Sequence, residues 1–191
     1  DVRGVVTDER EQTSATIVGV RPDGERTFLH TRGCLRNFRA SDVVRQISLV
    51  KKARIFAFGY LGLLPESDKD LGWLCRTLKE QTDVRILIDT GGTPNKEPKV
   101  LRSFLPYVDY FLPSFEEAIA ITGRKTPEDI VSHLYKCGAR GVVGVKLGSK
   151  GCYIASRDRR VYVPAVHVKD IVDATGAGDA FGEAHAVHGA A

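Results

Sequence analysis

The stretch Asp173-Ala174-Thr175-Gly176-Ala177-Gly178-Asp179-Ala180-Phe181 decides how the rest of this chain of 191 residues is interpreted. Apolar, often β-branched residues precede it from Val166 to Val172, and small or helix-tolerant residues follow it to Ala191. This order predicts a strand, a tight glycine turn and the start of a helix. Because glycines let the backbone approach a ligand and the first amides of a helix are unpaired, the stretch predicts an anion-binding turn.

The carboxylate of Asp179 is the unusual part of this turn. A carboxylate beside a phosphate-sized anion would repel it, which does not suit a simple phosphate clamp. The same carboxylate suits a base that removes the proton from an attacking hydroxyl group. We therefore expect Asp179 to be a general base.

Two other interpretations of the same residues stay open at this point. An aspartate in a first helical turn is favoured by the helix dipole alone, so Asp179 could be a structural residue. The glycines Gly176, Gly178 and Gly182 also lie near the dinucleotide-binding pattern, although their spacing, G-x-G-x-x-x-G, is not that of the pattern. The chain ends too soon to supply the acidic ribose partner expected about 20 residues further on.

This stretch resembles the D-T-x-G-A-G-D motif of the ribokinase-like (PfkB) carbohydrate kinases. The resemblance implies that Asp179 is the catalytic base and that the backbone of Gly176, Ala177 and Gly178 forms the anion hole for the transferred phosphoryl group. It also implies that Asp173 and Thr175 help to bind a monovalent cation such as K⁺.

A second matching element follows the apolar run that ends at Lys146 and Leu147. The residues Gly148-Ser149-Lys150-Gly151 resemble the family's T/K-L-G-x-x-G element, which lies along the phosphates and ribose of ATP. Lys146 could offer a cation to a phosphate, and Gly148 and Gly151 a close backbone approach. A G-x-x-G sequence between two β runs is also a good hairpin turn, so this alternative stays open.

Two carboxylates lie near the ends of predicted strands. Ser114 and Glu117 have the spacing of a helix capping box, and the family has N-x-x-E here, whose glutamate helps to organise Mg²⁺-bound water. The resemblance therefore implies an indirect magnesium role for Glu117, with Ser114 in place of the asparagine. Asp89 follows an apolar strand, where open α/β sheets present functional groups, but it could equally cap its own loop.

The N-terminal part of the chain predicts a β-hairpin. The β-rich runs 13–20 and 26–30 flank Arg21-Pro22-Asp23-Gly24-Glu25, which is a turn sequence. The resemblance implies that this hairpin belongs to a lid over the sugar and that two lids could pair in a homodimer. The segment Thr31 to Asn37 resembles the family's H-x-x-G-A-N element, with Cys34 in place of alanine and the asparagine displaced.

Strands expected near residues 55, 86, 110 and 143 alternate with helices expected over 41–49, 66–81 and 126–137. This alternation predicts a three-layer α/β/α sandwich with a mainly parallel sheet. The resemblance implies that this sandwich has the ribokinase-like fold. We expect one domain over residues 1–191, with 13–30 as the lid hairpin. The absence of methionine, and of the family's first strands and last helices, predicts that the chain is part of a longer protein.

Composition narrows the functional classes. The net charge of +4 is small and the basic residues are dispersed, so we expect no nucleic-acid partner. No apolar run approaches the ~18 residues of a membrane span, and the first residues do not resemble a signal peptide, so a cytoplasmic protein is expected. The four cysteines have no C-x-x-C spacing and predict neither a zinc site nor a disulfide framework.

Taken with the resemblance, these residues predict an enzyme that uses ATP and Mg²⁺ to phosphorylate a hydroxyl group of a sugar or related polyol. A nucleoside kinase of the same family is the nearest alternative. A kinase-like binding protein without catalysis is the alternative from another class.

Overall fold

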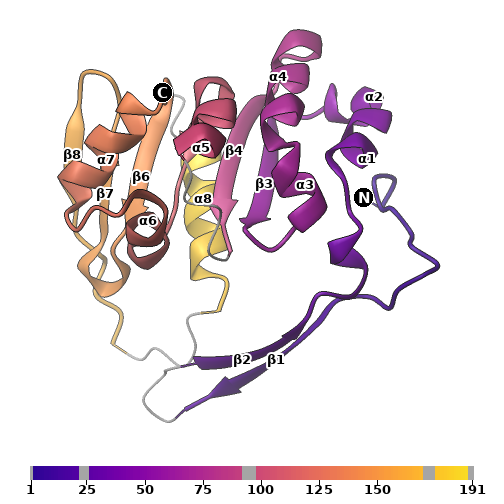
Figure 1. Cartoon of the computed structure of the whole chain (residues 1–191). Helices are drawn as coiled ribbons and strands as arrows, with labels where there is room; N and C mark the ends of the chain where they lie inside the picture. The colour runs from indigo at the N-terminus through magenta and orange to yellow at the C-terminus, as the bar shows by residue number, and fades with distance from the viewer. Residues whose placement is uncertain (1, 22–25, 92–97, 170–174, 189–191) are drawn as a thin grey trace.

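The computed structural model describes residues 2–21, 26–91, 98–169 and 175–188. These residues form a six-stranded sheet, helices on both of its faces, and a separate two-stranded hairpin (Figure 1). The main sheet runs in the order β3-β4-β5-β6-β7-β8, so neighbours in sequence are also neighbours in space. Its strands are β3 (Ile55–Leu61), β4 (Arg85–Thr90), β5 (Tyr110–Phe111), β6 (Val142–Lys146), β7 (Cys152–Ala155) and β8 (Arg160–Val163).

Strands β3 to β6 are parallel to one another. At one side of the sheet, β7 pairs antiparallel with β6, and β8 pairs antiparallel with β7. The expected ribokinase-like α/β sandwich with a mainly parallel sheet is thus confirmed. Because the four parallel strands all end on one side, the side chains that follow them share the carboxyl edge of the sheet.

Helices connect the parallel strands. The α-helices are α1 (Ala40–Arg45), α2 (Ile47–Val50), α3 (Pro65–Lys69), α4 (Leu71–Gln81), α5 (Pro98–Phe104), α6 (Phe115–Thr122), α7 (Pro127–Lys136) and α8 (Ala177–His188). Three 3₁₀ turns are η1 (Gly33–Arg36), η2 (Leu105–Tyr107) and η3 (Gly148–Lys150). The predicted helix over 41–49 is divided at Gln46, and the one over 66–81 at Asp70. Helix α1 begins at Ala40 and not after Ser41, because Asp42 accepts the Arg39 amide from inside the first turn.

The two faces of the sheet are covered unequally. Alternate strand residues, such as Ile86, Phe111 and Val143, point into one large core beneath the helices α4 to α7. Their neighbours Leu87 and Tyr110 point to the other face, where they form a small cluster that Phe181 of α8 packs against. Figure 1 shows α8 behind the sheet and α4 to α7 in front of it. The three layers are therefore present, with a thin third layer in the described part of the chain.

The hairpin of β1 (Ala15–Val20) and β2 (Arg26–Thr31) confirms the predicted pairing, although its turn at 22–25 lies outside the described residues. It extends beyond the carboxyl edge of the sheet, the edge to which the arrows of β3 and β4 point (Figure 1). Its far end reaches the start of α8, where the guanidinium of Arg26 donates to the Thr175 hydroxyl at 3.3 Å. Ile17 and Leu29, which face each other across the hairpin, are both 68% exposed.

One strand prediction was wrong. Val166 and Val168 do not form a strand before the glycine turn; they are exposed and not in regular structure, and 170–174 lie outside the described residues. β-branched residues favour a strand only where a neighbouring strand and a buried face await them, and here the described structure offers neither. Within the described ranges no helix has the length and apolar character needed to cross a membrane.

Candidate active site

The carboxyl edge of the parallel strands brings together residues that are far apart in the sequence. Asp89 and Thr90 end β4, Ser114 follows β5, and Lys146 ends β6. Ser114 and Lys146 form an isolated parallel bridge, in which the Lys146 amide donates to the Pro113 carbonyl at 3.0 Å. The ends of three adjacent strands thus contribute an acidic group (Asp89), a hydroxyl group (Ser114) and a basic group (Lys146) to this edge.

Lys146 and Asp89 form a two-oxygen ion pair. The Lys146 ammonium donates to both carboxylate oxygens of Asp89, at 2.7 and 2.8 Å, and the two side chains are only 17% and 16% exposed. Burial raises the pKa of the Asp89 carboxyl, although Lys146 and the Thr90 amide oppose this shift. An ammonium group has three donors, so one donor of Lys146 remains for another acceptor.

The glycine turn lies against this ion pair. A Cβ atom added at Gly178 would be 3.4 Å from the Lys146 ammonium nitrogen. The ammonium group is therefore next to the backbone that the sequence predicts to be the anion hole. Gly178 leaves room for that approach, because any side chain would have to share the space with Lys146.

Asp179 lies in the first turn of α8. Gly176 has a φ of 82°, which glycine adopts without steric cost, and its carbonyl accepts the first helical bond from the Ala180 amide at 2.9 Å. The amides of Ala177 to Asp179 precede that bond, so the helix itself does not use them. The Asp179 carboxylate is exposed and makes no hydrogen bond or ion pair with any residue that the structure describes. It is thus available to an external partner.

Glu117 is fixed by three donors on one oxygen. Its Oε2 accepts from the Ser114 amide at 3.0 Å, from the Ser114 hydroxyl at 2.7 Å and from the Thr90 hydroxyl. The capping box that the sequence offered as an alternative is present, since Glu117 N also donates to Ser114 Oγ at 3.3 Å. The other oxygen, Oε1, has no hydrogen bond within the described ranges, so the structural role leaves it free for a hydrated cation.

The two glycines of the predicted nucleotide loop differ. Gly148 has a φ of 59° and open space where a side chain would lie, which is compatible with a ligand. A Cβ at Gly151 would be 2.0 Å from the Val163 carbonyl oxygen. Packing against the end of β8 therefore explains the glycine at 151, and its contact with a nucleotide stays a prediction.

The predicted cation ligands are only partly described. Thr175 is exposed and accepts the hydrogen bond from Arg26, whereas Asp173 lies outside the described residues. No group of three or more histidine, cysteine, aspartate or glutamate side chains arranged to hold a metal occurs within the described ranges.

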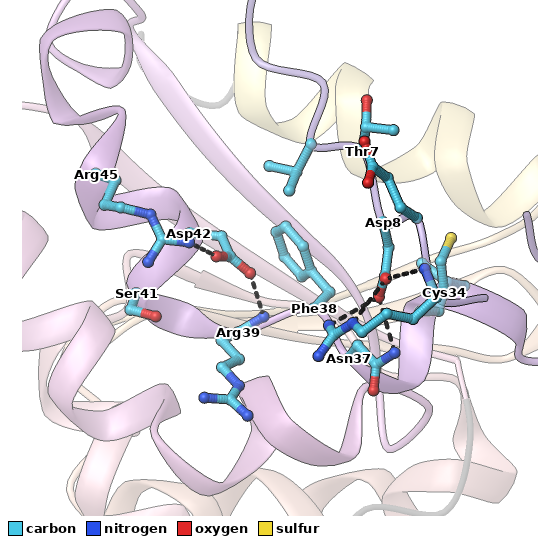
Figure 2. Close-up of a pocket in the computed structure, with 13 residues that line it drawn as sticks. Thr7, Asp8, Cys34, Asn37, Phe38, Arg39, Ser41, Asp42 and Arg45 are labelled. Atoms are coloured by element: carbon cyan, nitrogen blue, oxygen red, sulfur yellow. Dashed lines mark hydrogen bonds and ion pairs between the residues drawn. The ribbon is translucent and has the colours of Figure 1, made fainter.

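A cavity of about 580 Å³ lies elsewhere, between residues 6–10 and 34–45. Three acidic residues, Asp8, Glu9 and Asp42, are among those that line it. Two of them are paired within the protein: Asp8 accepts from Arg10 and Asn37, and Asp42 from Arg45 and the Arg39 amide (Figure 2). The pairing with Arg10 and Asn37 holds the pKa of the Asp8 carboxyl far below its usual range. Because no residue of the glycine turn and none of Asp89, Glu117 and Lys146 lines it, we do not regard this cavity as the active site.

The sequence did not predict which of these residues would meet. Lys146 and Asp89 are 57 positions apart, and Thr90 and Glu117 are 27 apart. The available signal was that each follows or ends an apolar run, which places it at one edge of a parallel sheet. The pairing within that edge depends on strand order, which no local pattern contains.

The described geometry defines a class: a ribokinase-like α/β protein with a glycine turn at the carboxyl edge of its sheet, a lysine beside that turn, and an aspartate in the first turn of the following helix. The comparisons then show the family. The pfkB family carbohydrate kinase profile matches residues 1–182, and the chain belongs to this family.

Among similar proteins, the chain is 30% identical to fructokinase-1 of Oryza sativa subsp. japonica over 95% of this chain and 58% of that protein. It is 28% identical to fructokinase-2 of Zea mays over 95% of this chain and 56% of that protein. A solved structure of Arabidopsis thaliana ribokinase complexed with ribose and ATP has a TM-score of 0.72 and 26% identity, covering 93% of this chain and 56% of that one. The chain thus spans little more than half the length of these relatives.

Proposed function

We propose that this chain is the phosphotransfer core of an enzyme that moves the γ-phosphoryl group of ATP to a hydroxyl of a carbohydrate. Membership of the pfkB family supports the carbohydrate class. The fructokinases and the ribokinase with ribose and ATP support a small sugar as acceptor and ATP as donor. The observation that carries the proposal is the carboxylate of Asp179, which has no partner among the described residues and lies beside helix-start amides that the helix does not use.

Asp179 accepts the proton of the sugar hydroxyl as its oxygen attacks the γ-phosphorus. The new oxygen–phosphorus bond forms while the bond from the γ-phosphorus to the bridging oxygen breaks, and ADP leaves with that electron pair. A base in this place contributes because the alcohol is a weak nucleophile until its proton is removed.

The turn and Lys146 stabilise the negative charge on the moving phosphoryl group. The amides of Ala177, Gly178 and Asp179 are not used by the helix, and the third donor of Lys146 lies beside them. Such fixed donors lower the barrier because they need no reorganisation when charge develops. Asp89 positions the ammonium group by holding it with two hydrogen bonds.

The charge balance of this edge fits a divalent cation. Asp89, Glu117 and Asp179 carry three negative charges against one positive charge on Lys146, and ATP adds more. Mg²⁺ prefers oxygen ligands and keeps several waters, so Glu117 Oε1 would hold it through water. When bound, Mg²⁺ supplies charge neutralisation on the phosphates.

The remaining predicted contacts lie around this centre. Gly148, with open space and a positive φ, allows the nucleotide to approach the backbone after β6, and Gly151 closes that loop. Thr175, together with Asp173, would hold a monovalent cation such as K⁺.

The hairpin completes the proposal as a lid over the sugar. It crosses the carboxyl edge of the sheet, and Arg26 joins it to Thr175 at the start of α8 (Figure 1). Ile17 and Leu29 leave apolar surface exposed, and a second copy of the hairpin would cover it in a homodimer.

Replacement of Asp179 by asparagine tests the proposal. In the full-length protein we expect turnover with Mg²⁺, ATP and the best sugar of a panel to fall about 10²- to 10⁴-fold, with ATP affinity almost unchanged. Asp158→Asn, at an exposed aspartate of the turn between β7 and β8, is the matched control and should retain full turnover. Unchanged turnover in Asp179→Asn would rule out its role as base. A wild-type protein that binds sugar without phosphorylating it would instead support the kinase-like binding protein.

A further inference from the structure

Tyr60 has an unusual backbone conformation. Its φ is 62°, and no other non-glycine residue in the described ranges has a positive φ. A bulky aromatic residue rarely adopts the left-handed region, because its Cβ atom crowds the backbone there. Such residues persist where the surrounding structure imposes the conformation, and they concentrate at functional sites.

A bulge at the end of β3 creates this conformation. Phe58 pairs with Ile88, but Leu61, and not Tyr60, pairs with Thr90, so β3 holds one extra residue. Bulges commonly redirect a side chain near an active site. Here the bulge changes the direction of the Tyr60 side chain just before the carboxyl edge.

Neighbouring residues hold the bulge in place. A Cβ at Gly91 would be 2.8 Å from both Cα and Cδ1 of Tyr60, so only glycine leaves room for the ring. The Gly91 amide donates to the Leu61 carbonyl at 3.2 Å, and the Leu63 amide to the Tyr60 carbonyl at 2.9 Å. On the following loop, Asp68 accepts from the Gly62 amide at 3.0 Å. The conformation is therefore specified by several independent contacts.

The strained residue gains little burial in return. Tyr60 is 58% exposed, and no hydrogen bond of its hydroxyl group is found within the described structure. A residue that served only the core would not keep both an unfavourable φ and an exposed ring. The ring is thus accessible to a ligand.

The strand order indicates which ligand the Tyr60 ring would meet. Glu117, Lys146 and Gly148, which the proposed function assigns to phosphates and nucleotide, follow β5 and β6. Tyr60 is near the end of β3, which lies on the other side of β4 from β5 and β6. The carboxyl end of β3 is at the edge that the hairpin extends beyond (Figure 1). With the phosphates and the nucleotide assigned to the β5 and β6 side, the β3 side of the edge is left for the phosphoryl acceptor.

We propose that Tyr60 is a platform for the acceptor sugar, with the face of its ring against the apolar C–H face of the sugar. This rests on the proposed function. The electron-rich face of an aromatic ring attracts weakly positive C–H groups, and a rigid side chain loses little entropy on contact. Stacking orients the sugar, so that a single hydroxyl points toward the phosphoryl group.

The test compares variants of the full-length protein in binding and in stability. Tyr60→Gly removes the ring and the strain together, so we expect its melting temperature to equal or exceed that of the wild type. We expect sugar affinity to fall at least about tenfold, measured by saturation-transfer NMR titration with D-fructose, D-ribose and adenosine. Tyr60→Phe should bind sugar within about twofold of wild type, since the ring face remains. Trp73→Ala, which removes an exposed aromatic ring from α4, is the control and should bind normally.

Each outcome decides the inference. Unchanged sugar affinity in Tyr60→Gly would overturn it and leave the kinase proposal standing. Sugar binding that depends on Tyr60 without phosphorylation would support it and count against the kinase proposal. A loss confined to adenosine would assign the ring to a nucleobase, and no binding of any of the three to the wild type would also overturn it.

Discussion

Strand β4 has a lysine–aspartate ion pair at each end, and the two pairs differ in their surroundings. At the amino end, Asp109 accepts from Lys79 and from the Ile86 amide, both at 2.6 Å, and Lys79 also donates to the Val84 carbonyl. This pair joins α4, β4 and the residue before β5. At the carboxyl end, Lys146 contacts Asp89 and lies beside the glycine turn.

The surroundings of the two pairs lead to different predictions for their replacement. The Lys79–Asp109 pair is about one third exposed, yet its partners include the backbone of the strand that it supports. The Lys146–Asp89 pair is more buried, and its ammonium group lies beside Gly178 of the glycine turn. Each ammonium group has two acceptors among the described residues, so it is the neighbouring elements, and not the number of unused donors, that distinguish the two pairs.

The largest expected effect comes from removing the lysine at the carboxyl end. Lys146→Met should lower kcat/KM for ATP about 10²- to 10³-fold, because a fixed positive charge next to the transferred phosphoryl group is lost. Initial-rate kinetics over a range of ATP concentrations measure this. The unfolding free energy should change much less, since the raised pKa lets Asp89 become neutral when its partner is removed. Wild-type kinetics in Lys146→Met would show that neither ion pair takes part in catalysis, and would contradict the functional role proposed for the pair at the carboxyl end.

The next effect is on stability, at the amino end. Asp109→Ala should lower the unfolding free energy by about 1–3 kcal/mol in urea titrations, because the Ile86 amide and Lys79 lose their shared acceptor. The kcat/KM of the folded fraction should stay at the wild-type value. A selective loss of catalysis without loss of stability would contradict the structural assignment.

The smallest expected effect is on stability and concerns Asp68, a carboxylate near the carboxyl edge that is not paired with a lysine among the described residues. Burial raises the pKa of Asp68 to about 6, and its buried Oδ1 has no hydrogen-bond partner among the residues that the structure describes. A raised acid pKa means that stability falls as pH rises from about 4 to about 6 and then stays low.

Asp68→Asn removes this titration. Its unfolding free energy should exceed that of the wild type at pH 8 by of the order of 1 kcal/mol, after allowance for partial solvent screening. The advantage should shrink between pH 6 and pH 4 and disappear below that range. Thermal unfolding at a series of pH values measures it, and an advantage that grew toward low pH would show that the pKa is lowered and not raised.

Much of the fold was predictable because its signals are local. Apolar runs ending in polar residues gave β3, β4 and β6, and the Ser114 to Glu117 spacing gave the start of α6. Two β-rich runs around a turn gave the hairpin. The strand predicted at Val166 and Val168 failed because it rested on local propensity alone. These valines favour a strand, but they have no partner strand in the described structure. Helix α5 was not predicted.

The sequence by itself determined the family and the candidates for chemistry. The spacing of glycines and aspartate from 173 to 179 needs no tertiary context, because neighbouring residues alone build a turn and a helix start. The alternation of strand-like and helix-like segments likewise determined that the strands would be parallel and would end at one edge.

Only the tertiary structure decided which of those residues meet. It placed the Lys146 ammonium group against Asp89 and beside Gly178, and it brought the Thr90 hydroxyl to Glu117. It left Asp179 without a partner in the described chain. It also produced the left-handed Tyr60, which no sequence pattern marks. The physical reason is that ion pairing and backbone strain depend on strand order and register, and these are set by packing across the whole sheet.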